Sequence, residues 1–138
     1  MRITLESDYA LRIVAVLAEE DRLLDANTIA EKTLVTPKFA LKILRKLVFG
    51  NIVSSFKGAK GGYKLKMLPE NITLKTVIEL IDGPIVIARC LGGDEACNLN
   101  PDKSSCVFHH IFDSISIDLA KKLNKITIKD IINREYSL

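Results

Sequence analysis

The sequence predicts a mainly α-helical protein with one small β-hairpin: a winged helix-turn-helix followed by a long C-terminal dimerisation helix. Three observations predict this fold class. Two short helical segments follow one another over 27–49, and the second is basic. Two strand-like runs flank a glycine-rich turn over 51–68. A later helical segment, 106–123, carries an apolar stripe that the winged-helix part does not need for its own core.

The first helix is predicted over 6–20. Its buried face is expected to consist of Leu11, Val14, Ala15, Leu17 and Ala18. Asp8 lies in the first turn, where the helix dipole favours a carboxylate, and this structural role is preferred to a ligand role. A turn is predicted over 21–26. The next short helix, NTIAEKTLV, has Thr28 and Glu31 at the spacing of a capping box.

The second helix of the helix-turn-helix is predicted over 36–49. Thr36 is a favoured N-cap, Pro37 is favoured at the first helical position, and Gly50 is favoured just past the end. One side of the helix is apolar: Ala40, Leu41, Ile43, Leu44, Leu47 and Val48. The other side is cationic: Lys38, Lys42, Arg45 and Lys46. This two-sided pattern is typical of a recognition helix.

The strand-like runs NIVSSF and YKLKML, joined by KGAKGG, predict a hairpin whose tip carries Lys57 and Lys60. From Lys32 to Pro69 the chain has nine Lys or Arg and no Asp or Glu. Charge runs are often only solvated faces, but these cations fall on the two elements that a winged helix places on a duplex. The pattern therefore favours DNA binding. The residues expected to contact DNA are Thr36, Pro37, Lys38, Phe39, Lys42, Arg45, Lys46, Lys57 and Lys60.

Charge and composition exclude several other classes. Residues 1–68 have twelve basic and seven acidic side chains, whereas 69–138 have eight and ten. The apolar run IVAVLA is too short for a membrane span or a signal sequence, so a cytoplasmic protein without a membrane partner is expected. An odd number of cysteines, three, argues against a disulfide framework. No nucleophile–base pair or phosphate-cradling loop is visible, so we do not expect an enzyme.

Beyond the hairpin, Thr73 is predicted to cap the helix TLKTVIELI, and Thr127 a short last helix, IKDIIN. Between them, the predicted helix from Ser105 carries a stripe at spacings of three and four: Phe108, Ile111, Phe112, Ile115 and Leu119. A crossing copy of the same helix would cover this stripe in a twofold dimer, which we favour over packing against the first helix of the same chain. The expected division is a winged-helix DNA-binding domain at 1–83, a cysteine-bearing sensor loop at 84–106, and the dimerisation and C-terminal helices at 107–138.

The cysteine segment offers metal ligands. Cys90, Cys97 and Cys106 are separated by six and eight residues, and His109 and His110 follow. Thiolate-rich sets suit zinc or iron–sulfur clusters, and zinc motifs usually show tighter pairs, so the wide gaps favour a cluster. Buried structural cysteines and a hydrogen-bonded core histidine are the alternative.

The order of these features resembles the iron–sulfur transcription regulators typified by IscR and NsrR. The matching stretches are MRITLESDYALRIV, TIAEKTLVTPKFALKILRKLVFGNIVSSFKGAKGGYKL, LPENITLKTVIELIDGP, the three cysteines, and ITIKDII. The resemblance implies a homodimeric regulator, expected to be a repressor, whose affinity for a palindromic operator depends on a bound cluster. It implies that Cys90, Cys97 and Cys106 are ligands of that cluster, with 2Fe–2S favoured and 4Fe–4S open.

The fourth ligand has three candidates. His109 is favoured because it matches the C-x-x-H spacing of IscR-like members; Asp8 of the partner subunit is second, as in NsrR-like relatives, and His110 third. Two other functions stay open: a regulator with a cluster-free thiol or zinc switch, and a small redox enzyme or electron carrier. The last is least favoured because it gives the basic helix and the hairpin no role.

Overall fold

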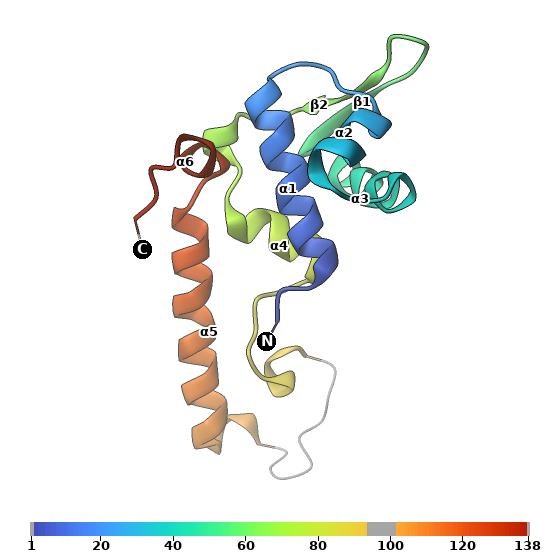
Figure 1. Ribbon diagram of the computed structural model, residues 1–138. Coiled ribbons are helices and arrows are strands. Elements are labelled where there is room, and N and C mark those ends of the chain that lie inside the picture. Colours follow the sequence, from blue (N-terminus) through green and yellow to red (C-terminus); the bar gives the residue numbers. More distant parts are fainter. Residues whose placement is uncertain (1, 94–101, 138) are drawn as a thin grey trace.

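A computed structural model describes residues 2–93 and 102–137. Within these ranges the helices are α1 (Leu5–Glu20), α2 (Ala26–Thr33), α3 (Pro37–Phe49), α4 (Leu74–Asp82), α5 (Val107–Lys125) and α6 (Ile128–Asn133). The strands are β1 (Val53–Phe56) and β2 (Gly62–Leu65), and the short 3-10 turns are η1 (Pro69–Asn71), η2 (Arg89–Leu91) and η3 (Lys103–Ser105). The predicted fold class, mainly helical with one hairpin and a long C-terminal helix, is confirmed (Figure 1).

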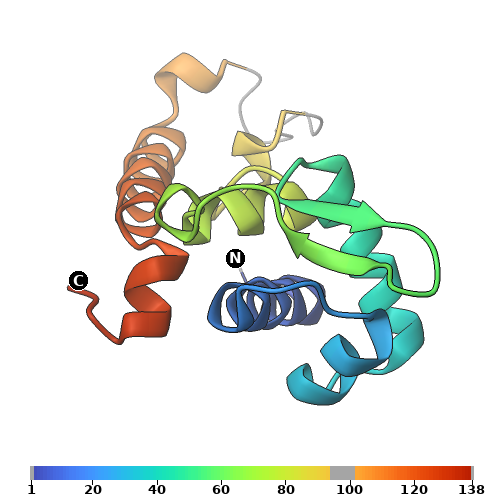
Figure 2. The same cartoon turned by 90° about the horizontal axis from the view of Figure 1, so that it is seen from above.

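Helix α1 is the centre of the first part of the molecule. It packs against α2 and α3 on one side and against α4 and α6 on the other (Figures 1 and 2). Because neighbours lie on both sides, its buried face is wider than predicted. Val14, Leu17 and Ala18 are buried as expected, Leu11 and Ala15 are only half-buried, and Ala10 and Ile13 are also completely buried.

Helix α2 begins earlier than predicted. Asp25 is its N-cap, and its carboxylate accepts hydrogen bonds from the N–H (3.0 Å) and the hydroxyl (2.7 Å) of Thr28. The predicted capping box of Thr28 and Glu31 is therefore wrong. The aspartate three residues upstream is a favoured cap, and it engages both groups of Thr28.

Helix α3 begins and ends where predicted, with Thr36 as N-cap and Gly50 just past the end. Gly50, however, has an ordinary φ of −77°, and the left-handed conformation falls on Asn51 at φ 59°. A Cβ at position 50 would overlap with the end of the Leu80 side chain on α4, which would have to shift. Glycine here therefore allows close packing between α3 and α4.

The predicted hairpin is present, with β1 and β2 antiparallel and Val53 opposite Leu65. It is attached to the segment before α2 by two backbone hydrogen bonds between Leu24 and Tyr63, of 3.0 Å and 2.7 Å. Gly62, at φ 152°, allows this close approach, since a side chain there would collide with the backbone of Leu24. The hairpin is therefore held in a defined position relative to the helix-turn-helix.

The predicted caps Thr73 of α4 and Thr127 of α6 are both confirmed. Helix α6 returns to the first part of the chain: the N–H of Ile128 donates to the carbonyl of Ile72 at 2.8 Å, and Ile128 is completely buried. Helix α5 instead extends away from the winged-helix part (Figure 1) and contacts α4, η2 and η3. Among the described helices, none is both long and apolar enough to span a membrane.

Candidate nucleic-acid interface and cysteine site

The cationic side of α3 faces solvent. Lys38, Lys42 and Arg45 are exposed, while Lys46 is half-buried. Thr36 and Pro37, also exposed, form the first turn, and the hydroxyl of Thr36 accepts the N–H of Phe39. The sequence places these cations together because Ala40, Ile43, Leu44 and Leu47, at helical spacing, are buried in the core on the opposite side.

The hairpin adds cations next to α3. Lys57 and Lys60, at its tip, are exposed, and β1 packs against α3. In both views the hairpin and α3 project on the same side of α1 (Figures 1 and 2). A recognition helix and a wing thus form one basic surface, as a groove-binding protein requires.

Phe39, predicted to contact DNA, is half-buried and packs edge-to-face on Tyr9 of α1, with ring centroids 5.7 Å apart. The guanidinium of Arg12 lies 5.3 Å from the Tyr9 ring, and the ammonium of Lys42 lies 5.4 Å from the Phe39 ring. Arg12 also forms an ion pair with Asp8 at 2.6 Å. These contacts form a continuous row from α1 to α3 and fix the start of the recognition helix.

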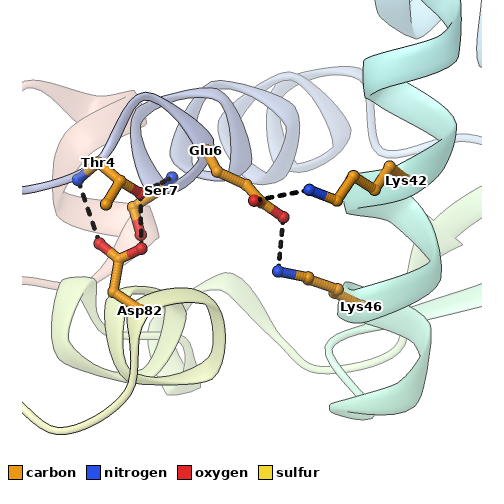
Figure 3. Close-up of polar contacts among 6 residues, drawn as sticks. All are labelled: Thr4, Glu6, Ser7, Lys42, Lys46 and Asp82. Atoms are coloured by element: carbon orange, nitrogen blue, oxygen red, sulfur yellow. Dashed lines mark hydrogen bonds and ion pairs between the residues drawn. The ribbon is translucent and has the colours of Figure 1, made fainter.

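Glu6 is the site residue that sequence reasoning missed. Its carboxylate pairs with Lys46 at 2.6 Å and with Lys42 at 3.1 Å (Figure 3). The hydrogen bond with Lys46 lowers the pKa of Glu6 below its usual value, against the opposing effect of burial, and Lys42 lowers it further. No local spacing could reveal the pair, since Glu6 and Lys42 are 36 residues apart.

The same end of α1 is bound to α4. Thr4, the N-cap of α1, donates its hydroxyl (2.6 Å) and its N–H (3.2 Å) to the carboxylate of Asp82 (Figure 3). Burial opposes ionisation of Asp82 and is the largest single influence on it, but the hydrogen bonds from Thr4 and Ser7 and the charge of Lys46 together lower the pKa of this carboxyl below its usual value. The start of α1 therefore connects the recognition helix with the point where the chain leaves α4 for the cysteine segment.

Two of the three cysteines lie in the described residues, and both are free, half-buried thiols. Cys90 is in η2, and Cys106 is the N-cap of α5. Turn η2 packs against α5, and the N–H of Ile87 donates to the hydroxyl of Ser116, at 3.1 Å, on that helix. The two cysteine-bearing elements are thus held together. Cys97 and the rest of 94–101, within the predicted loop, lie outside the described residues.

The two histidines differ. A ring nitrogen of His110, Nε2, lies 2.7 Å from the carbonyl oxygen of Ser104. Nδ1 of His109 is buried and has no hydrogen-bond partner among the described residues. Within 2–93 and 102–137, no three His, Cys, Asp or Glu side chains gather as a metal site, and Asp8 is engaged by Arg12 on its own helix.

The apolar stripe of α5 is left uncovered by its own chain. Phe108, Ile111, Phe112 and Ile115 are 64%, 48%, 36% and 47% exposed, and Leu119 is half-buried. Packing of the stripe against α1 of the same chain, the alternative to a dimer, is therefore wrong for the four exposed residues.

A winged helix-turn-helix with a basic recognition helix and wing defines a DNA-binding protein, and comparison with known proteins gives its family. Residues 3–134 match the family model Rrf2, described as an iron-dependent transcriptional regulator. The chain belongs to the Rrf2 family of DNA-binding transcriptional regulators, which is not an enzyme family. The resemblance to IscR and NsrR is confirmed at this level.

The chain is similar to known proteins along almost its whole length. An Aquifex aeolicus protein described as an HTH-type transcriptional regulator is 32% identical over 128 residues, 92% of this chain and 88% of the relative. NsrR of Bacillus subtilis is 25% identical over 141 residues, covering 100% and 94%. The structure of CymR, the global cysteine regulator of B. subtilis, superposes with a TM-score of 0.73 at 25% identity, covering 97% and 98%. IscR of T. potens, at 17% identity, shares the fold with a TM-score of 0.76, covering 99% and 89%.

Proposed function

We propose that this chain is a homodimeric Rrf2 repressor whose affinity for a palindromic operator is controlled by an iron–sulfur cluster. Cys90, Cys97 and Cys106 would be three ligands and His109 the fourth. The observation that carries the proposal is the buried Nδ1 of His109, which has no hydrogen-bond partner in the described part of the chain and lies one helical turn after Cys106. A buried polar atom of this kind needs a partner, and a metal ion is one that imidazole accepts.

The donor set fits such a group. Cys90 and Cys106 are reduced, partly accessible thiols on two elements that pack together. Thiolates with one imidazole are ligands that iron–sulfur centres use, and 2Fe–2S is favoured over 4Fe–4S. When bound, the cluster supplies a one-electron redox centre whose potential depends on its ligands and their surroundings. The protein's part is to hold the four donors and limit their access to solvent.

The order of the fourth-ligand candidates follows from their present partners. His110 is already hydrogen-bonded to Ser104 and is third. Asp8 of the partner subunit is second, because it would have to give up the 2.6 Å ion pair that Asp8 forms with Arg12. His109 is first because its Nδ1 has no hydrogen bond to give up among the residues that the structure describes.

A second copy of this chain is the proposed cover for the α5 stripe. Exposed aromatic and branched side chains in one row are characteristic of an interface between protomers. Crossing α5 against a second α5 would bring two identical stripes together about a twofold axis. Two recognition helices would then face half-sites about 34 Å apart or a multiple of that distance.

A physical route exists from the cysteine segment to the recognition helix. Asp82, at the end of α4, holds Thr4; from the same end of α1, Glu6 and Tyr9 hold α3. A change in the segment after α4 would reach α3 through these contacts. A small rotation is sufficient, because operator binding depends on the spacing of two helices.

The test is direct. Protein purified without air should contain iron and sulfide, and its visible absorbance should be proportional to the protein concentration. Cys106→Ser should abolish this absorbance, and His109→Ala should shift it, whereas His110→Ala, the matched control, should leave it unchanged. Operator binding measured with and without the cluster should differ by at least tenfold. Parent protein without iron and sulfide, or a spectrum insensitive to Cys106→Ser, would overturn the proposal.

A cluster-free thiol switch is the second candidate. It is supported by the free thiols of Cys90 and Cys106 and by the similarity to CymR, described as a cysteine regulator. In that case iron-free protein should lose operator binding on mild oxidation and regain it on reduction, and zinc should protect the thiols if it is the resident metal. Insensitivity of iron-free protein to oxidation would exclude this candidate.

A further inference from the structure

The cationic face of α3 is partly neutralised by the protein itself. Two of the four cations on this face, Lys42 and Lys46, form ion pairs with the two carboxylate oxygens of Glu6 (Figure 3). Lys38 and Arg45 form no ion pair with any residue that the structure describes. The number of cations on α3 therefore exceeds the number that are free to contact a DNA phosphate.

The Glu6 pair is better protected than an ordinary surface pair. The side chain of Glu6 is only 18% exposed, while Lys42 and Lys46 are 55% and 39% exposed. Reduced contact with water strengthens the attraction and weakens its screening by salt. Lys42 is also held against the ring of Phe39, at 5.4 Å, which limits its freedom to turn toward another anion.

A DNA phosphate that approaches Lys42 or Lys46 meets a carboxylate already within hydrogen-bonding distance of the ammonium. It must displace Glu6 or accept repulsion from it, and either outcome lowers the gain from the contact. This cost falls on every phosphate alike, so it weakens binding that depends on phosphates only. Binding that also depends on base contacts by Lys38 and Arg45 is affected less.

We infer that Glu6 limits sequence-independent DNA binding: as a built-in counterion, it withholds Lys42 and Lys46 from phosphate contacts and so lowers affinity for random DNA. The inference rests only on the DNA-binding part of the proposed function and requires no cluster.

The experiment compares Glu6→Gln with Glu20→Gln in iron-free protein binding a random-sequence duplex. Glu20 is a matched control, because it lies on the same helix and also pairs with two cations, Arg22 at 3.0 Å and Lys32 at 2.7 Å. Both variants change the net charge equally. E6Q should bind about tenfold more tightly than E20Q at moderate salt. Its slope of log affinity against log salt should be steeper by about 1.8, since each added phosphate contact contributes about 0.9.

The lysines decide whether the effect is local. In a Lys42→Met/Lys46→Met background, adding E6Q should give no gain in affinity for the random duplex. A gain that persists without the lysines, or an E6Q that binds no more tightly than E20Q, would overturn the inference.

Thermal melting checks that E6Q is folded; if it is not, the lysine double variant alone is informative. If Glu6 withholds both lysines from DNA, the lysine double variant should have a slope of log affinity against log salt within about one of the parent value. A decrease of about 1.8 would contradict the inference. Because all measurements use iron-free protein and random DNA, their failure leaves the cluster proposal untouched. Absence of any DNA binding by the parent protein would instead contradict the proposed function.

Discussion

The winged-helix part and the α5 region of this chain are stabilised in different ways. In the first, Ile13, Leu44 and Ile128 come from three helices and are completely buried in one core. In the second, the one buried residue of α5 is a serine, Ser116, and most of its large apolar side chains are exposed. The first region is complete within one chain. The second has the composition of an interface, which is why we propose that another copy and a cluster complete it.

The two regions meet in a small number of defined contacts. Ser116 accepts the N–H of Ile87 and donates to the carbonyl of Phe112 at 2.7 Å, so it holds the cysteine segment to α5. Helix α6 then returns to the first core through Ile128. A helix that is held near its middle by Ser116 and continues into the first core through α6 can transmit a change at the cysteines without unfolding the DNA-binding part.

The largest expected effect tests the self-contained core. Leu44→Ala should lower the free energy of unfolding by about 2–5 kcal/mol, because it leaves a cavity where close packing cannot collapse. Ile117→Ala on α5, where the side chain is 46% exposed, should cost much less. Urea unfolding followed by circular dichroism measures both. Equal losses would remove the distinction between the two regions.

The next prediction tests the uncovered stripe. Phe112→Asp should leave the winged-helix part folded and produce monomers, since a charge in an apolar seam costs several kcal/mol. Loss of the dimer should weaken operator binding by roughly a hundredfold, because two half-sites can no longer be bound together. Sedimentation and anisotropy titration measure these changes. The control is Ile117→Asp, the same charge outside the stripe, which should stay dimeric; a monomeric parent would contradict the idea.

A smaller effect is expected at the wing. Lys60→Ala should weaken binding to operator and random duplex alike and reduce the salt slope by about 0.9, since the loss is one phosphate contact. Arg45→Ala should additionally reduce the preference for the operator, because arginine can pair with a guanine edge. Titrations at several salt concentrations distinguish the two. If both variants bind as the parent does, the basic surface is misassigned.

How far the sequence predicted this molecule depends on the range of the interactions. The caps Thr36, Thr73 and Thr127 were predicted correctly because a cap interacts within three residues of itself. Asp25 was missed although its signal is equally local: Thr28 and Glu31 offered a competing pattern, and the better cap lay in a predicted turn.

Residues whose partners lie far along the chain could not be predicted. Glu6 was treated as an ordinary helix residue because its lysines lie on another helix. The glycine at 50 was predicted correctly as the residue just past a helix end, but its close contact with Leu80 of another helix was not. The ligand set, the DNA contacts and the dimer stay predictions from sequence, supported by the exposed residues and by the His109 nitrogen that has no hydrogen-bond partner among the described residues.

The smallest expected effect is a pH dependence at the joint between α1 and α4. Against burial, the hydrogen bonds from Thr4 and Ser7 and the charge of Lys46 together lower the pKa of Asp82 in the folded protein below its usual value of 3.8. The stability from this carboxylate is therefore fully present above about pH 4 and is lost as the pH falls through the folded pKa. Asp82→Asn should lower the urea midpoint at pH 7, and the difference from the parent should shrink as the pH falls below 3.8 toward the folded pKa. Asp113→Asn, the same charge removal on the exposed side of α5, is the control and should change the midpoint little. A deficit of Asp82→Asn that is constant from pH 7 to pH 3 would mean that the charge of Asp82 does not stabilise the joint.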